Sequence, residues 1–278
     1  MTGKLGIIAG GGDLPRAVAL SARQAGREVF VVALRGSLTE DWVADFPHLA
    51  LSIGEPGRAL KALKHAGAAD ILLAGKVDRP KFNEIKLDAK GVMVLPRVVA
   101  AARKGDDALL RCMIEMFEQE GFRAVGVAEA APGLICGEGP LGQLSPGAEH
   151  QADIARAIAI VRALGALDVG QAAAVCEGLA LAVEAAEGTD AMIARIATLK
   201  DNLRGTPEKK RGVLAKALKP TQDAKTDMPV IGTSTVRNAA AAGLAGIALE
   251  AGKSLIVDKA AVAAEADRFG LFVCGVTP

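Results

Sequence analysis

Aromatic residues are scarce in this chain of 278 residues, which has no Tyr, one Trp and 3% aromatic residues in all. Single-stranded nucleic acids are bound largely by stacking bases on aromatic rings, so this scarcity argues against a nucleic-acid partner. The formal net charge of +1 provides no long-range field that would attract nucleic acid or an anionic membrane. We therefore expect no nucleic-acid partner, and a core built from Ala, Val, Leu and Ile.

Long apolar runs and paired cysteines are also missing. No apolar segment approaches the roughly 20 residues needed to span a bilayer. A strand is predicted almost directly after Met1, so we expect no signal peptide. The four cysteines are far apart and form no CxxC pair, which disfavours a zinc or thioredoxin-like site. These absences predict a cytoplasmic protein whose contact with a membrane is peripheral.

The motifs of several nucleophilic and metalloprotease enzymes are absent. The chain has no Gly-x-Ser-x-Gly elbow and no HExxH motif. Its three histidines, His48, His65 and His150, lie outside the charged clusters of the sequence. We therefore expect metal-assisted or electrostatic chemistry in place of a Ser or Cys nucleophile.

The order of apolar runs predicts an α/β protein with two domains. Buried strands at 5–8, 28–34, 70–74 and 122–127 alternate in the first half with helices, one of them at 97–104, which predicts a Rossmann-like parallel sheet covered on both faces. The second half is a shorter and more mixed α/β pattern. The predicted divisions are a nucleotide-binding domain at 1–130, a Gly- and Pro-rich linker at 131–147, and a catalytic and lipid-binding domain at 148–278.

A glycine-rich turn separates the first predicted strand from the first predicted helix. The turn lacks the GxGxxG spacing of dinucleotide sites and the Gly-Lys-Ser/Thr of a Walker A loop. It can be a tight turn without a ligand, or it can let a nucleotide approach the backbone and the helix N-terminus. A basic residue follows the fourth strand, at a sheet edge where ligands bind in open α/β folds. The candidate binding residues here are Gly10, Gly11, Gly12, Leu14, Pro15, Gly75 and Lys76.

Charged residues gather after a predicted strand at 212–218. Asp223 and Asp227 are four residues apart and can share a divalent cation, while Lys216 and Lys219 can hold phosphate oxygens. A solvated charged loop with nothing bound is the alternative. A second acidic turn runs from Glu184 to Asp190. Thr189 or Asp190 can be a plain helix N-cap, or the turn can be a cation site.

These segments, in this order, resemble the LpxI-type UDP-2,3-diacylglucosamine diphosphatases of lipid A biosynthesis. Among the matching pieces are Leu5-Gly-Ile-Ile-Ala-Gly-Gly-Gly, Gly75-Lys76-Val77, Asp168-Val-Gly-Gln171, Val183-Glu-Ala-x-Glu-Gly-Thr-Asp190 and Lys216-x-x-Lys219-Pro-x-Gln222-Asp223. Each piece is weak alone, but the ordered set covers nearly the whole chain and is specific.

The resemblance implies an enzyme of a Gram-negative bacterium. It implies Mg²⁺-dependent hydrolysis of the pyrophosphate of UDP-2,3-diacylglucosamine to UMP and 2,3-diacylglucosamine 1-phosphate (lipid X). The substrate is then expected between the two domains, and the protein is expected at the inner face of the inner membrane, with a homodimer as one possibility. A nucleotide-binding regulatory protein without turnover is the alternative, and an NAD-dependent oxidoreductase is disfavoured by the missing fingerprint.

Roles for individual residues follow as a hypothesis. Asp223 first, and Asp227 second, would be a metal ligand or the base that orients water, with Asp190 as the third carboxylate. Lys216 and Lys219 would offset charge on the phosphates. The remaining polar contacts with the substrate would come from Thr189, Gln171 and Gln222.

Overall fold

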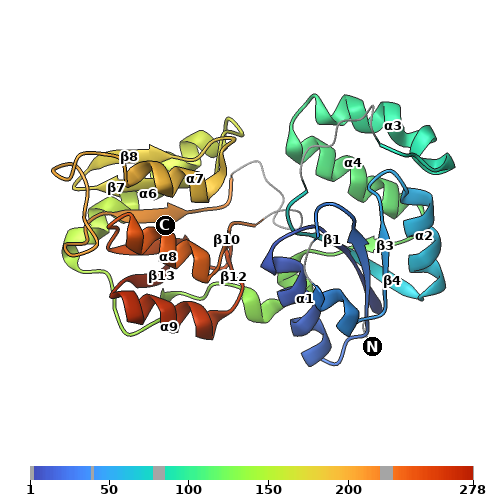
Figure 1. The fold of residues 1–278 in the computed structure, drawn as a ribbon, viewed down its shortest axis with the longest axis horizontal. Coiled ribbons are helices and arrows are strands. Elements are labelled where there is room, and N and C mark those ends of the chain that lie inside the picture. The colour runs from blue at the N-terminus through green and yellow to red at the C-terminus, as the bar shows by residue number, and fades with distance from the viewer. Residues whose placement is uncertain (1–2, 39–40, 78–84, 220–227, 278) are drawn as a thin grey trace. The chain divides into compact units, whose positions relative to one another are not determined.

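The computed structural model describes residues 3–38, 41–77, 85–219 and 228–277, which form two compact units (Figure 1). The units are Met1–Gly133 and Leu134–Pro278. The first contains a five-stranded parallel sheet and the second a six-stranded mixed sheet. The α/β class predicted from the sequence is confirmed.

The first unit alternates strands with helices along the chain. The first strand is followed by a helix whose N-cap is Gly12. Strands and helical segments then continue to alternate as far as the fourth strand. The elements are β1 (Lys4–Ala9), α1 (Asp13–Gln24), β2 (Val29–Leu34), η1 (Asp41–Asp45), β3 (His48–Leu51), α2 (Pro56–His65), β4 (Ala68–Ala74), α3 (Ala89–Ala102), α4 (Asp106–Gln119), β5 (Arg123–Ala124) and α5 (Val127–Ala130).

The strand order of the first sheet is β3-β2-β1-β4-β5, and it explains why a ligand crevice is expected there. The order reverses between β1 and β4, so the segments after these two strands depart toward opposite faces. Strand β1 is buried on both faces: Ile8 packs in a cluster with Leu60 and Leu63 of α2 and with Phe117 of α4. The carboxyl ends of β1 and β4 are thereby held side by side.

Two predicted elements of this unit differ from the structure. The helix predicted at 97–104 begins at Ala89, because the Asp88 carboxylate caps it by accepting from the Gly91 N–H at 2.7 Å. Pro96 lies inside this helix. The strand predicted at 122–127 is only the two residues of β5, because the chain turns at Gly126 into α5.

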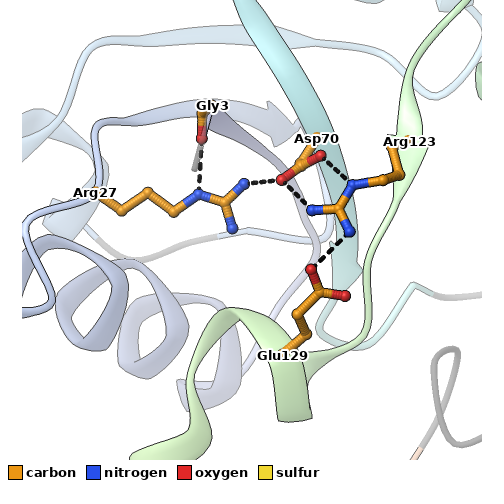
Figure 2. A network of polar contacts seen from close by, with 5 residues as sticks. All are labelled: Gly3, Arg27, Asp70, Arg123 and Glu129. Carbon is orange, nitrogen blue, oxygen red and sulfur yellow. Dashed lines mark hydrogen bonds and ion pairs between the residues drawn. The ribbon is translucent and has the colours of Figure 1, made fainter. Parts of the chain in front are cut away.

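A buried ion network fixes the amino end of the same sheet (Figure 2). The Asp70 carboxylate of β4 accepts from the buried Arg27 guanidinium and, at 2.7 Å to each oxygen, from Arg123 of β5. Arg27 also donates to the Gly3 carbonyl at 2.8 Å, and Arg123 reaches Glu129 of α5 at 2.7 Å. Burial opposes ionisation of Asp70, but the hydrogen bond from Arg123 and the charges of both arginines outweigh it and lower the pKa of this carboxyl.

The second unit begins within the stretch predicted as a linker. Residues Pro132–Leu134 form η2, and β6 (Gly139–Pro140) pairs with the last strand of the chain. The further elements are α6 (Ala148–Gly165), β7 (Ala172–Cys176), β8 (Leu179–Val183), α7 (Gly188–Ile196), β9 (Val213–Lys216), β10 (Val230–Ile231), α8 (Thr233–Ala241), β11 (Gly246–Glu250), β12 (Leu255–Ile256), α9 (Lys259–Phe269) and β13 (Phe272–Val276).

The second sheet has the order β6-β13-β11-β9-β7-β8, with β9, β11 and β13 parallel at its centre. One face packs on α6 through residues such as Ile154 and Ile158. The other face packs on α7, α8 and α9 through residues such as Met192, Val236 and Val262 (Figure 1). The three parallel strands therefore end together at one edge of a helix-covered sheet.

All four cysteines are buried and free of disulfide bonds. Burial raises the pKa of Cys136 and of Cys274 to about 11, which keeps both thiols protonated near neutral pH. They are therefore unsuited to act as nucleophiles. In the described part of the chain, no helix is both long enough and apolar enough to cross a membrane.

Candidate active site

The loops that follow β1 and β4 are joined by backbone hydrogen bonds at the carboxyl edge of the first sheet. The Gly11 N–H donates to the Lys76 carbonyl at 2.9 Å, and the Lys76 N–H donates to the Gly11 carbonyl at 2.8 Å. The Gly10 N–H donates to the Ala74 carbonyl at 2.8 Å. The structure thus brings together the two segments that the sequence proposed for nucleotide contact, and it exposes the Lys76 side chain beside them.

Close packing of these loops accounts for three of the glycines. A Cβ atom at Gly10 would lie 2.5 Å from the Lys76 carbonyl oxygen, one at Gly11 2.3 Å from that of Ser37, and one at Gly75 2.7 Å from that of Gly11. Gly12 is different, because a Cβ atom there would meet no atom within 4 Å, and its φ of 87° lies in the region that favours glycine at the N-cap of α1. Leu14 and Pro15 lie in the first turn of α1, where free N–H groups can face an anion.

A hydrogen-bonded relay lies at the carboxyl edge of the second sheet. Lys216, the last residue of β9, is only 4% exposed. Its ammonium donates to the Thr189 hydroxyl at 3.0 Å and to the Val230 carbonyl at 3.1 Å. Thr189, in the first turn of α7, donates in turn to Glu184 Oε1 at 2.7 Å. A buried cation and a buried carboxylate are therefore joined through one hydroxyl.

The backbone of Gln171 holds the other oxygen of this carboxylate. The Gln171 N–H donates to Glu184 Oε2 at 3.2 Å, and the Ala217 N–H donates to the Gln171 carbonyl at 3.2 Å. A Cβ atom at Gly170 would lie 2.1 Å from the Glu184 carbonyl oxygen, so only glycine permits this approach. The side-chain Oε1 of Gln171 is buried and accepts no hydrogen bond from the described residues.

Two further predicted site residues contact partners outside this relay. Asp190 is exposed, and its Oδ1 accepts from Asn238 of α8 at 3.0 Å. Lys219 forms an ion pair with Asp168 at 2.7 Å. Asp168 has a φ of 56°, a conformation that Asp tolerates better than most residues.

The segment that leaves β9 is also anchored by Glu250 at the end of β11. Glu250 Oε2 accepts from the Leu218 N–H at 3.3 Å, while Oε1 accepts from Arg162 at 3.1 Å and Lys253 at 2.9 Å. Burial opposes ionisation of Glu250, but hydrogen bonds from Lys253 and Arg162 prevail and lower the pKa of this carboxyl. The backbone at Leu218 is thereby fixed to the sheet.

Three predicted site residues, Gln222, Asp223 and Asp227, lie outside the described residues. Within the described ranges, no three His, Cys, Asp or Glu side chains form a group that could hold a metal ion. The metal-binding role of Asp223, Asp227 and Asp190 therefore stays a prediction.

The sequence placed Glu184 in the acidic turn of a possible cation site but gave this residue no role of its own. A carboxylate at the end of an apolar strand, five residues before a threonine that begins a helix, was the available signal. The sequence could not show that the strand end and the helix start face the same lysine.

The fold and these contacts define a two-domain α/β protein with two hydrogen-bonded glycine-containing loops at a sheet edge in one domain and a buried cation at a sheet edge in the other. Comparison with known families gives the particular family. The model of the LpxI N-terminal domain matches residues 4–142, and that of the LpxI C-terminal domain matches residues 137–274. The chain belongs to the LpxI family.

A curated relative supports the same assignment over the whole length. The chain is 50% identical over 275 residues to the UDP-2,3-diacylglucosamine pyrophosphatase LpxI of Caulobacter vibrioides. The match covers 99% of this chain and 98% of the relative. The resemblance noted from the sequence is confirmed.

Proposed function

We propose that the protein is a hydrolase that cleaves the pyrophosphate of UDP-2,3-diacylglucosamine to UMP and 2,3-diacylglucosamine 1-phosphate in lipid A biosynthesis. The observation that carries this proposal is the 50% identity to a pyrophosphatase of that specificity across both domains. The buried Lys216 ammonium at the sheet edge is consistent with it, because a desolvated cation stabilises charge that develops on phosphate oxygens.

We propose Mg²⁺ as the cofactor, because the donor set consists of oxygen atoms. Asp223, Asp227 and Asp190 are carboxylates, the ligands that Mg²⁺ takes together with substrate phosphates. Asp190 suits this role, since the hydrogen bond from Asn238 uses only its Oδ1 and no described residue donates to Oδ2. Bound Mg²⁺ would neutralise charge on the pyrophosphate.

The chain's own residues would divide the remaining tasks. Lys216 and Lys219 would offset negative charge on the phosphates, and Asp223 would orient the attacking water. Gln171 would give its buried Oε1 a partner when substrate arrives, since it lacks one among the described residues. The Gly12 turn and Lys76 would receive the nucleotide end.

Hydrolysis by the purified protein tests this function. With UDP-2,3-diacylglucosamine and Mg²⁺ we expect UMP release, and with EDTA we expect none, because two phosphate groups would lose their counter-ion. The measurement is UMP by chromatography. No UMP with Mg²⁺, from protein shown to be folded, would favour the alternative of a nucleotide-binding regulatory protein.

We propose further that the protein works at a membrane surface, since a diacylated substrate resides in a bilayer. Val92 and Met93 of α3 support this, because they are 60% and 75% exposed although apolar. Arg103 and Lys104 follow the same helix and can face anionic headgroups.

Vesicle flotation tests this placement with a matched pair of variants. On vesicles of phosphatidylethanolamine and phosphatidylglycerol, we expect Met93→Glu to bind about tenfold more weakly than the wild type, because a charge replaces apolar contact. Leu167→Glu is the control, since Leu167 is equally exposed at 75% in the other unit. Equal binding by Met93→Glu and wild type would remove α3 from the proposal.

A further inference from the structure

We propose that Glu184 is a positioning residue for the reaction, acting on the Lys216 ammonium through the Thr189 hydroxyl. The inference rests on the proposed hydrolysis, and it assigns a role to a buried carboxylate that the reaction scheme above leaves unused. Glu184 is 7% exposed and Lys216 is 4% exposed. Both charges are therefore removed from water and need partners inside the protein.

The hydroxyl of Thr189 fixes the direction of the relay. Because its proton points to Glu184 Oε1 at 2.7 Å, its oxygen lone pairs face Lys216, whose ammonium donates at 3.0 Å. A carboxylate that orients a hydroxyl in this way holds the ammonium at one place and one angle. A glutamine in place of Glu184 has one acceptor oxygen for two donors, the Thr189 hydroxyl and the Gln171 N–H, so one of these hydrogen bonds would be lost and the hydroxyl would no longer be held by a charged acceptor.

Each member of the relay comes from a different element, so the sheet edge itself sets the geometry. Glu184 follows β8, Thr189 begins α7 and Lys216 ends β9. The second oxygen of Glu184 is held by the Gln171 N–H at the start of β7. The carboxylate therefore cannot turn away without losing a backbone partner as well.

Glu184 differs in this respect from another buried carboxylate of the same unit. Asp153 is 4% exposed and accepts from the backbone N–H groups of Glu177 and Gly178 at 2.8 and 2.7 Å. Both of these donors lie in the turn between β7 and β8, which contains no proposed site residue. Asp153 thus offers a control for the loss of a buried carboxylate as such.

A double-mutant cycle between Glu184→Gln and Lys216→Met tests the relay. We expect Lys216→Met to lower kcat about 100-fold and Glu184→Gln to lower it about tenfold with little change in KM. In the Lys216→Met background, Glu184→Gln should change kcat less than about twofold, because its target is gone. Thr189→Val should behave like Glu184→Gln, and Thr189→Ser, which keeps the hydroxyl, should lose less of the rate than Thr189→Val.

The control cycle and a measurement of stability distinguish failure of the relay from failure of the proposed hydrolysis. Asp153→Asn should have the same small effect on kcat in both backgrounds. A tenfold loss from Glu184→Gln that persists in the Lys216→Met background would show a merely structural role and overturn the inference. If the wild type releases no UMP, the proposed hydrolysis fails. The same cycle, read as the free energy of unfolding in urea by circular dichroism, then still decides the relay, and additive losses there would overturn it.

Discussion

Asp223→Asn is expected to lower the rate of UMP release by a factor of about 10² to 10⁴, the usual contribution of a positioned acid–base group. The amide keeps the size of the side chain but can neither accept a proton from water nor supply a negative oxygen to Mg²⁺. Binding of UDP-2,3-diacylglucosamine should persist, because the lysines and the glycine-rich turn are unchanged. The measurements are kcat by UMP release and substrate affinity by calorimetry.

Two further variants serve as a comparison and a control for this experiment. Asp227→Asn should lower the rate less than Asp223→Asn, since Asp223 is the first choice for the metal ligand or base. Asp201→Asn should leave the rate unchanged, because the Asp201 side chain is exposed and its ion pair is with Arg204, which is not a proposed site residue. Near-normal turnover by folded Asp223→Asn protein would reject the assignment of this carboxylate.

Asp70→Asn is expected to destabilise the first unit by about 3–5 kcal/mol, the cost of removing one partner from a buried ion pair. The Arg27 guanidinium would stay buried without its counter-charge, and Arg123 would lose its bidentate partner. The single tryptophan, Trp42, is buried in this unit, so its fluorescence during urea unfolding reports on the first unit alone.

The control for this variant is Glu129→Gln, which removes an exposed partner of the same Arg123. Its effect should stay below about 1 kcal/mol, because exposed ion pairs contribute little. An Asp70→Asn protein that unfolds at the wild-type urea concentration would refute the structural role of the network.

The same variant has an expected pH dependence. The folded pKa of Asp70 is lowered, so its ionised form contributes stability above the unfolded pKa of about 4 and loses it as the pH falls through the folded pKa. The stability difference between wild type and Asp70→Asn should therefore be full near neutral pH and shrink below about pH 4.

The sequence predicted the parts of the fold that depend on local pattern. Alternating apolar runs and turn glycines predicted the strands of the first sheet, and the pairing of β1 with β4 then placed Gly11 beside Lys76. The predicted start of α3 at residue 97 was wrong, because the helix begins after its cap, Asp88, and continues through Pro96. The N-cap at Asp88 determines where α3 begins, and the helix accommodates Pro96 in its interior.

The sequence predicted several of the residues in the site, but it did not predict which of them contact one another. Lys216, Thr189 and Gln171 were chosen separately, and the structure connects all three to one carboxylate. Glu184 had no role of its own in the prediction, because its contact with Lys216 through Thr189 depends on strands β8 and β9 ending at the same edge, which is a property of the sheet order. The local sequence does not indicate which strands end beside one another in the sheet.

The short strand β6 determines where the chain can be cut to study its halves separately. It covers the outer edge of β13, and the Cys136 N–H just before it donates to the Ser254 carbonyl at 2.8 Å. A fragment that began at residue 148 would leave the backbone of β13 unpaired along an edge, which invites edge-to-edge aggregation. A fragment that begins at Leu134 would keep this protection, so the practical boundary precedes the glycine-rich stretch.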